Sequence, residues 1–215
     1  MTGRSISIRS TIFPERGVRV SAGFWLLLAA AVMIAPPSLT AAVLLAAALH
    51  EGGHLAALRF FRVPVEGLRL GAFGAVLHAP GARRLSYGRE LLVTLAGPAA
   101  NLLLAPPLAA LSARFAWEWG FLFAGANVLL GVYNLLPVPP LDGGRALYLA
   151  AAYCFGPSVG ETAEAAAGLF CAAALTALGA YLTAVYGGAL FLLAALGLLF
   201  GALRQFGLAK IPISV

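Results

Sequence analysis

Long apolar runs separated by short polar or proline-containing stretches dominate the chain from about residue 20 onward. A membrane-crossing helix needs about 20 predominantly apolar residues, and these runs are long enough to supply several. We predict six such helices, with ends placed to within about two to four residues, at residues 20–36, 39–60, 89–112, 118–138, 161–184 and 187–204. The pattern therefore predicts an all-α polytopic membrane protein.

The longest interruption of this pattern covers residues 61–88, where Pro64 and several glycines disfavour a continuous helix. Leucine and alanine alternate with other residues over 68–72, and a second extended run follows at 75–78. This alternation predicts a short β-hairpin after the second helix, lying at the membrane interface. An unstructured connector is the alternative interpretation of this segment.

Composition supports lipid as the solvent of this chain. Of 215 residues, 61% are hydrophobic and 10% are charged, against about 45–50% and about 25% in a soluble domain. So few charged side chains could not cover the outside of a soluble protein of this size. The net charge of +6 does not indicate nucleic-acid binding, because no basic cluster is interleaved with aromatic residues.

The basic residues also predict an orientation in the membrane. If both termini lie in the cytoplasm, thirteen of the fourteen Lys and Arg residues lie on that side, and Arg114 lies outside. Cytoplasmic loops carry an excess of Lys and Arg, so this partition favours an even number of crossings. We therefore expect a multi-pass protein of the cell membrane with both termini cytoplasmic.

An HExxH motif, formed by His50, Glu51 and His54, lies inside the second predicted helix. Four residues along an α-helix separate the histidines by about 40° around the axis and about 6 Å along it, so both imidazoles can face one metal. Glu51 could then hold a water molecule at the metal and take its proton. Hydrogen bonding of these groups to neighbouring helices is the alternative, but three ionisable residues inside a span are costly without a metal.

Catalytic zinc sites normally use three protein ligands and keep one position open for water. The only aspartate of the chain, Asp142, follows three prolines within residues 137–140, which end the fourth predicted helix. Gly143 and Gly144 would let the backbone turn, so that the carboxylate points back into the helix bundle. Without the HExxH motif, an aspartate before two glycines would be interpreted as an ordinary turn.

Three motifs in this order resemble those of the site-2 protease family (peptidase family M50), in its compact bacterial type similar to the sporulation intramembrane protease. The HExGH motif of the family matches His50–His54 with Gly53, its GPxxN motif matches Gly97, Pro98 and Asn101, and its NxxPxxxxDG motif matches Asn134, Pro137, Asp142 and Gly143. The resemblance implies one Zn²⁺ per chain, held by His50, His54 and Asp142, with Glu51 as general acid and base. It further implies that Asn134 contacts substrate or the oxyanion, and that the other motif residues support the site.

The function expected from this resemblance is that of a zinc metalloendopeptidase. It would hydrolyse a peptide bond in or next to a transmembrane segment of a membrane-tethered protein, near the cytoplasmic face. Residues 1–215 would form a single membrane-embedded domain without a PDZ or CBS domain. The expected partners are the membrane-tethered substrate, the lipid bilayer and regulatory membrane proteins, with no nucleic acid.

Two other classes of function are weighed against proteolysis. A catalytically silent zinc-binding membrane protein could sequester partners, although a purely structural zinc site needs no base and is usually closed by a fourth protein ligand. A transporter needs polar groups along a pathway, and the last two predicted helices carry almost none in their interiors. Among the remaining polar residues, Asn101 either joins helices, the interpretation we favour, or orients ligands. We expect Asn127 mainly to join helices and His78 to be solvated.

Overall fold

The computed structural model describes residues 17–71, 74–186, 196, 197, 199 and 203. In chain order its elements are β1 (Gly17–Val20), α1 (Ala22–Ile34), α2 (Pro37–Phe60), β2 (Gly67–Gly71), β3 (Gly74–His78), the 3₁₀ helix η1 (Pro80–Arg84), α3 (Tyr87–Phe115), α4 (Glu118–Asn134), α5 (Asp142–Phe155) and α6 (Pro157–Tyr186).

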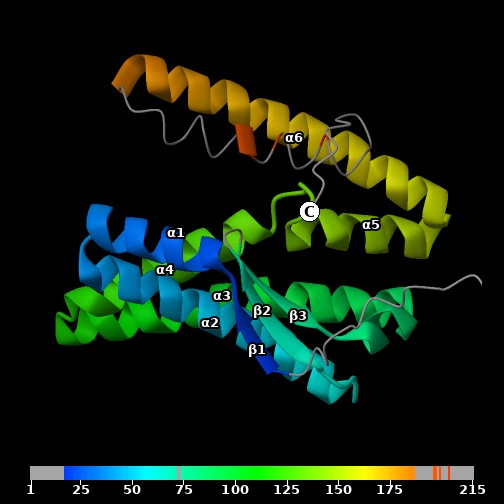
Figure 1. Ribbon diagram of the computed structural model, residues 1–215, viewed down its shortest axis with the longest axis horizontal. Coiled ribbons are helices and arrows are strands. Elements are labelled where there is room, and N and C mark those ends of the chain that lie inside the picture. Colours follow the sequence, from blue (N-terminus) through cyan, green and yellow to red (C-terminus); the bar gives the residue numbers. More distant parts are fainter. Residues whose placement is uncertain (1–16, 72–73, 187–195, 198, 200–202, 204–215) are drawn as a thin grey trace, which may run out of the picture.

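Helix α3 is the central element of this arrangement. It packs against α2, α4 and α5, while α6 packs along α5. Figure 1 shows α5 and α6 together on one side of the molecule, with α1 to α4 and the sheet on the other. The described part of the chain therefore consists of a four-helix body and a helical pair that reaches this body through α5.

Small residues allow the helices of the body to approach one another closely. Ala42 and Ala46 of α2 are fully buried against Phe123 and Ala126 of α4. A Cβ at Gly53 would overlap the backbone carbonyl of Ala96 on α3. Membrane helices gain little from burying apolar surface away from lipid, so close packing of short side chains is an ordinary way to hold them together.

The described strands form one small sheet in the order β1-β2-β3. Strands β2 and β3, which follow α2 in the chain, are antiparallel, with Leu68 opposite Leu77. The position of this hairpin at the membrane interface stays a prediction. Strand β1 pairs with β2 in parallel and was not predicted. Leu77 packs against the buried Leu58 and Val93, so the sheet is attached to the same end of α2 and α3 that carries the motif histidines.

Three described helices, α2, α3 and α6, are long and apolar enough to cross a membrane. The first and fourth predicted crossings are present as α1 and α4, but these have 13 and 17 residues. At about 1.5 Å per residue they measure about 20 Å and 26 Å, shorter than a hydrocarbon core of about 30 Å. Most of the sixth predicted helix, 187–204, lies outside the described residues, so the number of crossings stays a prediction.

Helix α5 differs from the expected pattern, because we predicted a turn where Asp142, Gly143 and Gly144 begin a helix. A Cβ at Gly143 would overlap the carbonyl of Leu135, and one at Gly144 would lie 2.9 Å from backbone atoms of Val138 and Pro139. These glycines therefore let the incoming segment pass closely over the first turn of α5. Close approach, rather than turn formation, explains the absence of side chains at both positions.

Candidate metal centre

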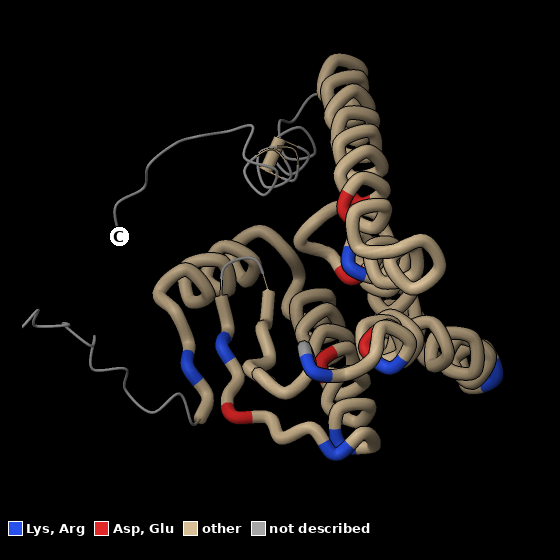
Figure 2. The backbone as a smooth tube through the Cα atoms, turned by 90° about the vertical axis from the view of Figure 1, so that its right-hand side faces the viewer, with Lys and Arg blue, Asp and Glu red and all other residues tan. Residues whose placement is uncertain are grey.

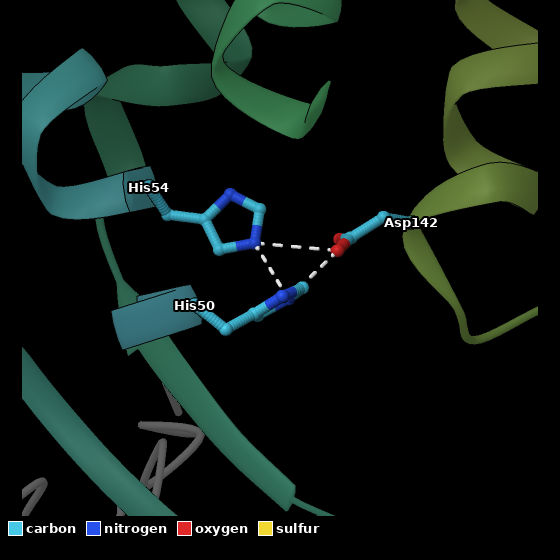
Figure 3. A group of neighbouring side chains, drawn as sticks. All are labelled: His50, His54 and Asp142. Carbon is cyan, nitrogen blue, oxygen red and sulfur yellow. Dashed lines mark hydrogen bonds and ion pairs between the residues drawn. The ribbon is translucent and has the colours of Figure 1, made fainter. Parts of the chain in front are cut away.

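His50 and His54 project from one face of α2 toward Asp142, the first residue of α5 (Figure 3). Atom Oδ2 of Asp142 lies 3.0 Å from Nε2 of His50 and 3.3 Å from Nε2 of His54. The two Nε2 atoms are 3.1 Å apart. Three potential ligand atoms from two helices therefore converge on one point, as the HExxH spacing and the single aspartate predicted.

The spacing of these three atoms fits a small divalent cation. Zinc binds imidazole nitrogen and carboxylate oxygen at about 2.0–2.2 Å, which places neighbouring ligands of a tetrahedral site about 3.3–3.6 Å apart. The observed separations of 3.0–3.3 Å are at or just below this range. Movements of a few tenths of an ångström would thus complete the coordination.

Hydrogen bonds fix the ring of His50 in the form that a metal needs. The Nδ1–H of His50 donates to Oδ1 of Asn101 at 2.8 Å, and Asn101 is fully buried. The Asn101 amide donates in turn to the carbonyl of Ala46 and to Oδ1 of Asn127. Asn127 donates to the carbonyl of Phe123, so each amide has one consistent orientation. The Nε2 lone pair of His50 consequently faces His54 and Asp142.

His54 is oriented in the same way by the backbone of α3. Its Nδ1–H donates to the carbonyl of Val93 at 2.8 Å, which leaves the Nε2 lone pair directed at Asp142. A Cβ at Gly97, one turn further along α3, would overlap the imidazole ring. Gly97 is therefore the residue that makes room for this side chain.

Asp142 completes an arrangement that is unfavourable without a cation. Its Oδ2 atom is buried and accepts no hydrogen bond, and two imidazole lone pairs face it. A buried polar atom without a partner is costly, and a divalent cation at the centre would satisfy all three groups. His50, His54 and Asp142 thus form a group that could hold a metal ion, and their chemistry fits Zn²⁺.

Glu51 lies beside this group without belonging to it. Its side chain is partly buried on α2 and interacts electrostatically with His50, His54 and Asp142. It is not among the three residues whose ligand atoms converge. A carboxylate in this position could orient a water molecule near the centre and exchange a proton with it.

The other predicted residues take different places. Asn134, at the C-terminal end of α4, donates to the carbonyl of Leu130 on its own helix, and its role in substrate contact stays a prediction. Pro98 is fully buried within α3, whereas Pro137 is partly buried in the segment between α4 and α5. His78 has 48% of its side chain exposed and lies 4.0 Å from Glu66, away from the three ligands.

Several supporting residues were missed or undervalued in the sequence. Asn101 was predicted either to join helices, the interpretation we favoured, or to orient ligands, and Asn127 was predicted to join helices. Both take part in the hydrogen-bond chain that orients His50. The carbonyl of Val93 could not be found from a side-chain motif. The signal for Asn127 in the sequence was an amide residue inside an apolar helix, the next one after the helix that carries the GPxxN motif.

Sequence comparison finds a matching family model and several similar proteins. The family model described as Peptidase family M50 matches residues 112–178. Zinc metalloprotease Rip3 of Mycobacterium tuberculosis is 37% identical over 114 residues, which cover 48% of this chain and 29% of that protein. Stage IV sporulation protein FB of Bacillus subtilis is 29% identical over 135 residues, covering 61% of this chain and 46% of that protein. The chain thus spans less than half the length of either relative.

The fold is also similar to a solved structure. The site-2 protease from Methanocaldococcus jannaschii superposes with a TM-score of 0.60, at 20% sequence identity, over 92% of this chain and 93% of that one. The resemblance that the three motifs predicted is confirmed by these relatives and by this fold.

Proposed function

We propose that this chain, a relative of the M50 peptidases with the site-2 protease fold, is an intramembrane zinc metalloendopeptidase. The observation that carries the proposal is the convergence of His50, His54 and Asp142 beside Glu51 on an apolar helix. Catalytic zinc typically has three protein ligands and a fourth position for water, whereas structural zinc has four protein ligands. Here three residues converge, and the Glu51 carboxylate lies outside that group.

The chemistry divides between the metal and the residues around it. When bound, Zn²⁺ would polarise the scissile carbonyl and lower the pKa of water toward about 7. Glu51 would take the proton of the attacking water and pass it to the leaving amine. Asn101 and the Val93 carbonyl would keep both imidazoles in the required tautomer while charge develops. Asn134 is proposed to contact the substrate or the oxyanion.

The position of the cut follows from where these groups lie along α2. His54 is six residues before the end of α2, about 9 Å along the helix axis, and Arg59 lies in the last turn. We therefore place the cut close to the cytoplasmic face, in or beside a transmembrane segment of a membrane-tethered protein. With both termini in the cytoplasm, thirteen of the fourteen Lys and Arg residues would lie on that side. Such an excess is typical of cytoplasmic loops and supports this orientation.

A helical substrate must unwind before it can be cut, because its carbonyls are engaged in the helix. Among the described strands, β3 pairs with β2 on one side and lies at the edge of the sheet. This edge could take up an extended peptide as an added strand. The proposed interfacial position of the hairpin would then bring the peptide to the end of α2 that carries the ligands.

A zinc-binding membrane protein that only sequesters partners is the second candidate function. Both functions require the ligands, but only proteolysis requires Glu51. Purified full-length protein, reconstituted in vesicles with single-pass reporter substrates, separates the two. Zinc content and cleavage should be measured in the parent, in Glu51→Gln and in the matched surface variant Glu66→Gln.

Proteolysis predicts zinc-dependent cleavage by the parent and by Glu66→Gln. Glu51→Gln should keep its zinc and cut at least about a hundred times more slowly, since general-base catalysis contributes about 10²- to 10⁴-fold. It should also retain uncut substrate during purification. Equal cleavage by Glu51→Gln and the parent, at equal zinc content, would disprove the assigned mechanism.

A further inference from the structure

One face of α3 serves all parts of the metal centre. Glu90, Val93, Gly97 and Asn101 follow one another at intervals of three or four residues, so they lie along one stripe of the helix. Asn101 orients His50, while Val93 and Gly97 orient and accommodate His54. The first member of the stripe, Glu90, is hydrogen-bonded to Arg145 instead of to a histidine.

Glu90 is joined to the helix that carries the third ligand. Its Oε1 accepts hydrogen bonds from Nε of Arg145 at 3.2 Å and from Nη2 at 2.5 Å. The side chain of Glu90 is 14% exposed and that of Arg145 is 44% exposed. The guanidinium also lies 4.8 Å from the ring centroid of Tyr148, which packs edge-on against Tyr87 of α3.

Arg145 lies one turn after Asp142 in α5. Its backbone amide donates to the carbonyl of Leu141 and so closes the first turn of the helix, at whose start Asp142 lies. On another side of this turn, Gly143 and Gly144 lie against the segment between α4 and α5. The Arg145 side chain adds a direct connection from this turn to α3.

We infer that Glu90 and Arg145 form a positioning pair, which sets the distance between Asp142 and the two histidines. Glu90 and Val93 lie one turn apart on α3. This short stretch therefore holds α5 through Arg145 and holds His54 through the Val93 carbonyl. Neither Glu90 nor Arg145 is among the residues that could hold the metal. The inference rests on the proposed metal centre, but it does not require that the protein cut peptides.

Simple attachment of α5 to the body predicts a different outcome from positioning. Partly exposed ion pairs contribute little to stability, about 0–1 kcal/mol, so an attachment role would leave the geometry of the metal site unchanged. Residues that orient metal ligands typically change metal affinity by about 10- to 100-fold. Metal affinity and ligand geometry therefore distinguish the two roles independently of cleavage.

The test is a double-mutant cycle on the full-length protein with Glu90→Gln, Arg145→Gln and both together. Zinc affinity should be measured by competition with a chelator, and ligand geometry by the visible spectrum of the Co²⁺-substituted protein. Arg145→Lys tests the fork geometry, because lysine keeps the charge but not the planar donors. Glu164→Gln is the matched control, since Glu164 also interacts electrostatically with Arg145.

We expect each single substitution to weaken zinc binding about tenfold and to alter the Co²⁺ spectrum. The double variant should lose no more than either single variant, because the pair acts as one unit. Arg145→Lys should be intermediate and Glu164→Gln should match the parent. Parental zinc affinity and Co²⁺ spectrum in Glu90→Gln and Arg145→Gln, or fully additive losses, would overturn the inference. A parent chain that binds no zinc would instead overturn the metal centre itself.

Discussion

The two parts of the metal centre are built in different ways. The histidines are four residues apart on one helix, so the helical repeat alone places their rings near each other. Asp142 comes from another helix, 88 residues after His54 in the chain. It reaches the site only because the segment before α5 passes closely over two glycines and α5 packs on α3.

This difference indicates where the site is vulnerable. Substitutions near the histidine pair act on single side chains whose partners are known hydrogen-bond acceptors on α3. Substitutions near Asp142 act on how two backbone segments and two helices pack. A packed backbone has few ways to adjust, so we expect the Asp142 side to tolerate less change.

The largest effect is expected for Gly143→Ala. The new Cβ would overlap backbone atoms of Leu135 and Leu136, and the first turn of α5 would have to move together with Asp142. Overpacking costs about 1–3 kcal/mol, and at its upper end this corresponds to a loss of zinc affinity of about 150-fold. Zinc titration of the purified variant measures the change.

Gly125→Ala provides the matched control for this substitution. It lies within α4 and its added Cβ meets nothing within 4 Å, so alanine should be neutral or stabilising in the helix. Parental zinc affinity in Gly143→Ala would show that the close approach does not position Asp142.

A smaller effect is expected for Gly97→Ala, because the overlap is with an imidazole rather than with backbone. The ring of His54 would have to leave the Val93 carbonyl to make room. We predict a loss of zinc affinity of about 10- to 30-fold, equivalent to about 1.4–2 kcal/mol. Gly88→Ala on the same helix has open space around its Cβ and should bind zinc like the parent. An unchanged Gly97→Ala would contradict the role assigned to this glycine.

The smallest of these effects is expected for Asn101→Leu. This substitution removes the acceptor that holds Nδ1–H of His50. It also leaves the side-chain Oδ1 of Asn127 without the hydrogen bond that the Asn101 amide donates. We expect zinc affinity to fall by about tenfold, the lower end of the range for loss of such a partner. Zinc titration and the Co²⁺ spectrum would both report the freed ring. If Asn101→Leu kept both, Asn101 would be a packing residue, the interpretation that we favoured from the sequence.

The sequence predicted the histidine side well, because a helical repeat is a local property. The HExxH spacing predicted the candidate ligand pair, and the single aspartate was the third candidate. The helices at 37–60 and 87–115 were also predicted to within three residues at each end. Local patterns were sufficient for the histidine pair and for these two helices, since neither feature depends on how distant segments pack.

The parts that failed depend on contacts between distant segments. Helix α5 was missed because Asp142-Gly143-Gly144 has the composition of a turn, and only the backbone of Leu135 and Val138 explains why glycine is needed in a helix there. Asn127 looked like ordinary packing until its amide was seen to orient Asn101. Strand β1 forms only by pairing with β2, about 50 residues later in the chain.

The central claim is that two differently built elements hold one zinc ion. Zinc content and zinc X-ray absorption of the purified parent, of Asp142→Ala and of His78→Ala test it most directly. We predict one zinc per chain with two imidazole ligands in the parent and in His78→Ala, and weaker, incompletely coordinated zinc in Asp142→Ala. Parental zinc content and an unchanged absorption spectrum in Asp142→Ala would contradict the claim, because the third ligand would then lie elsewhere.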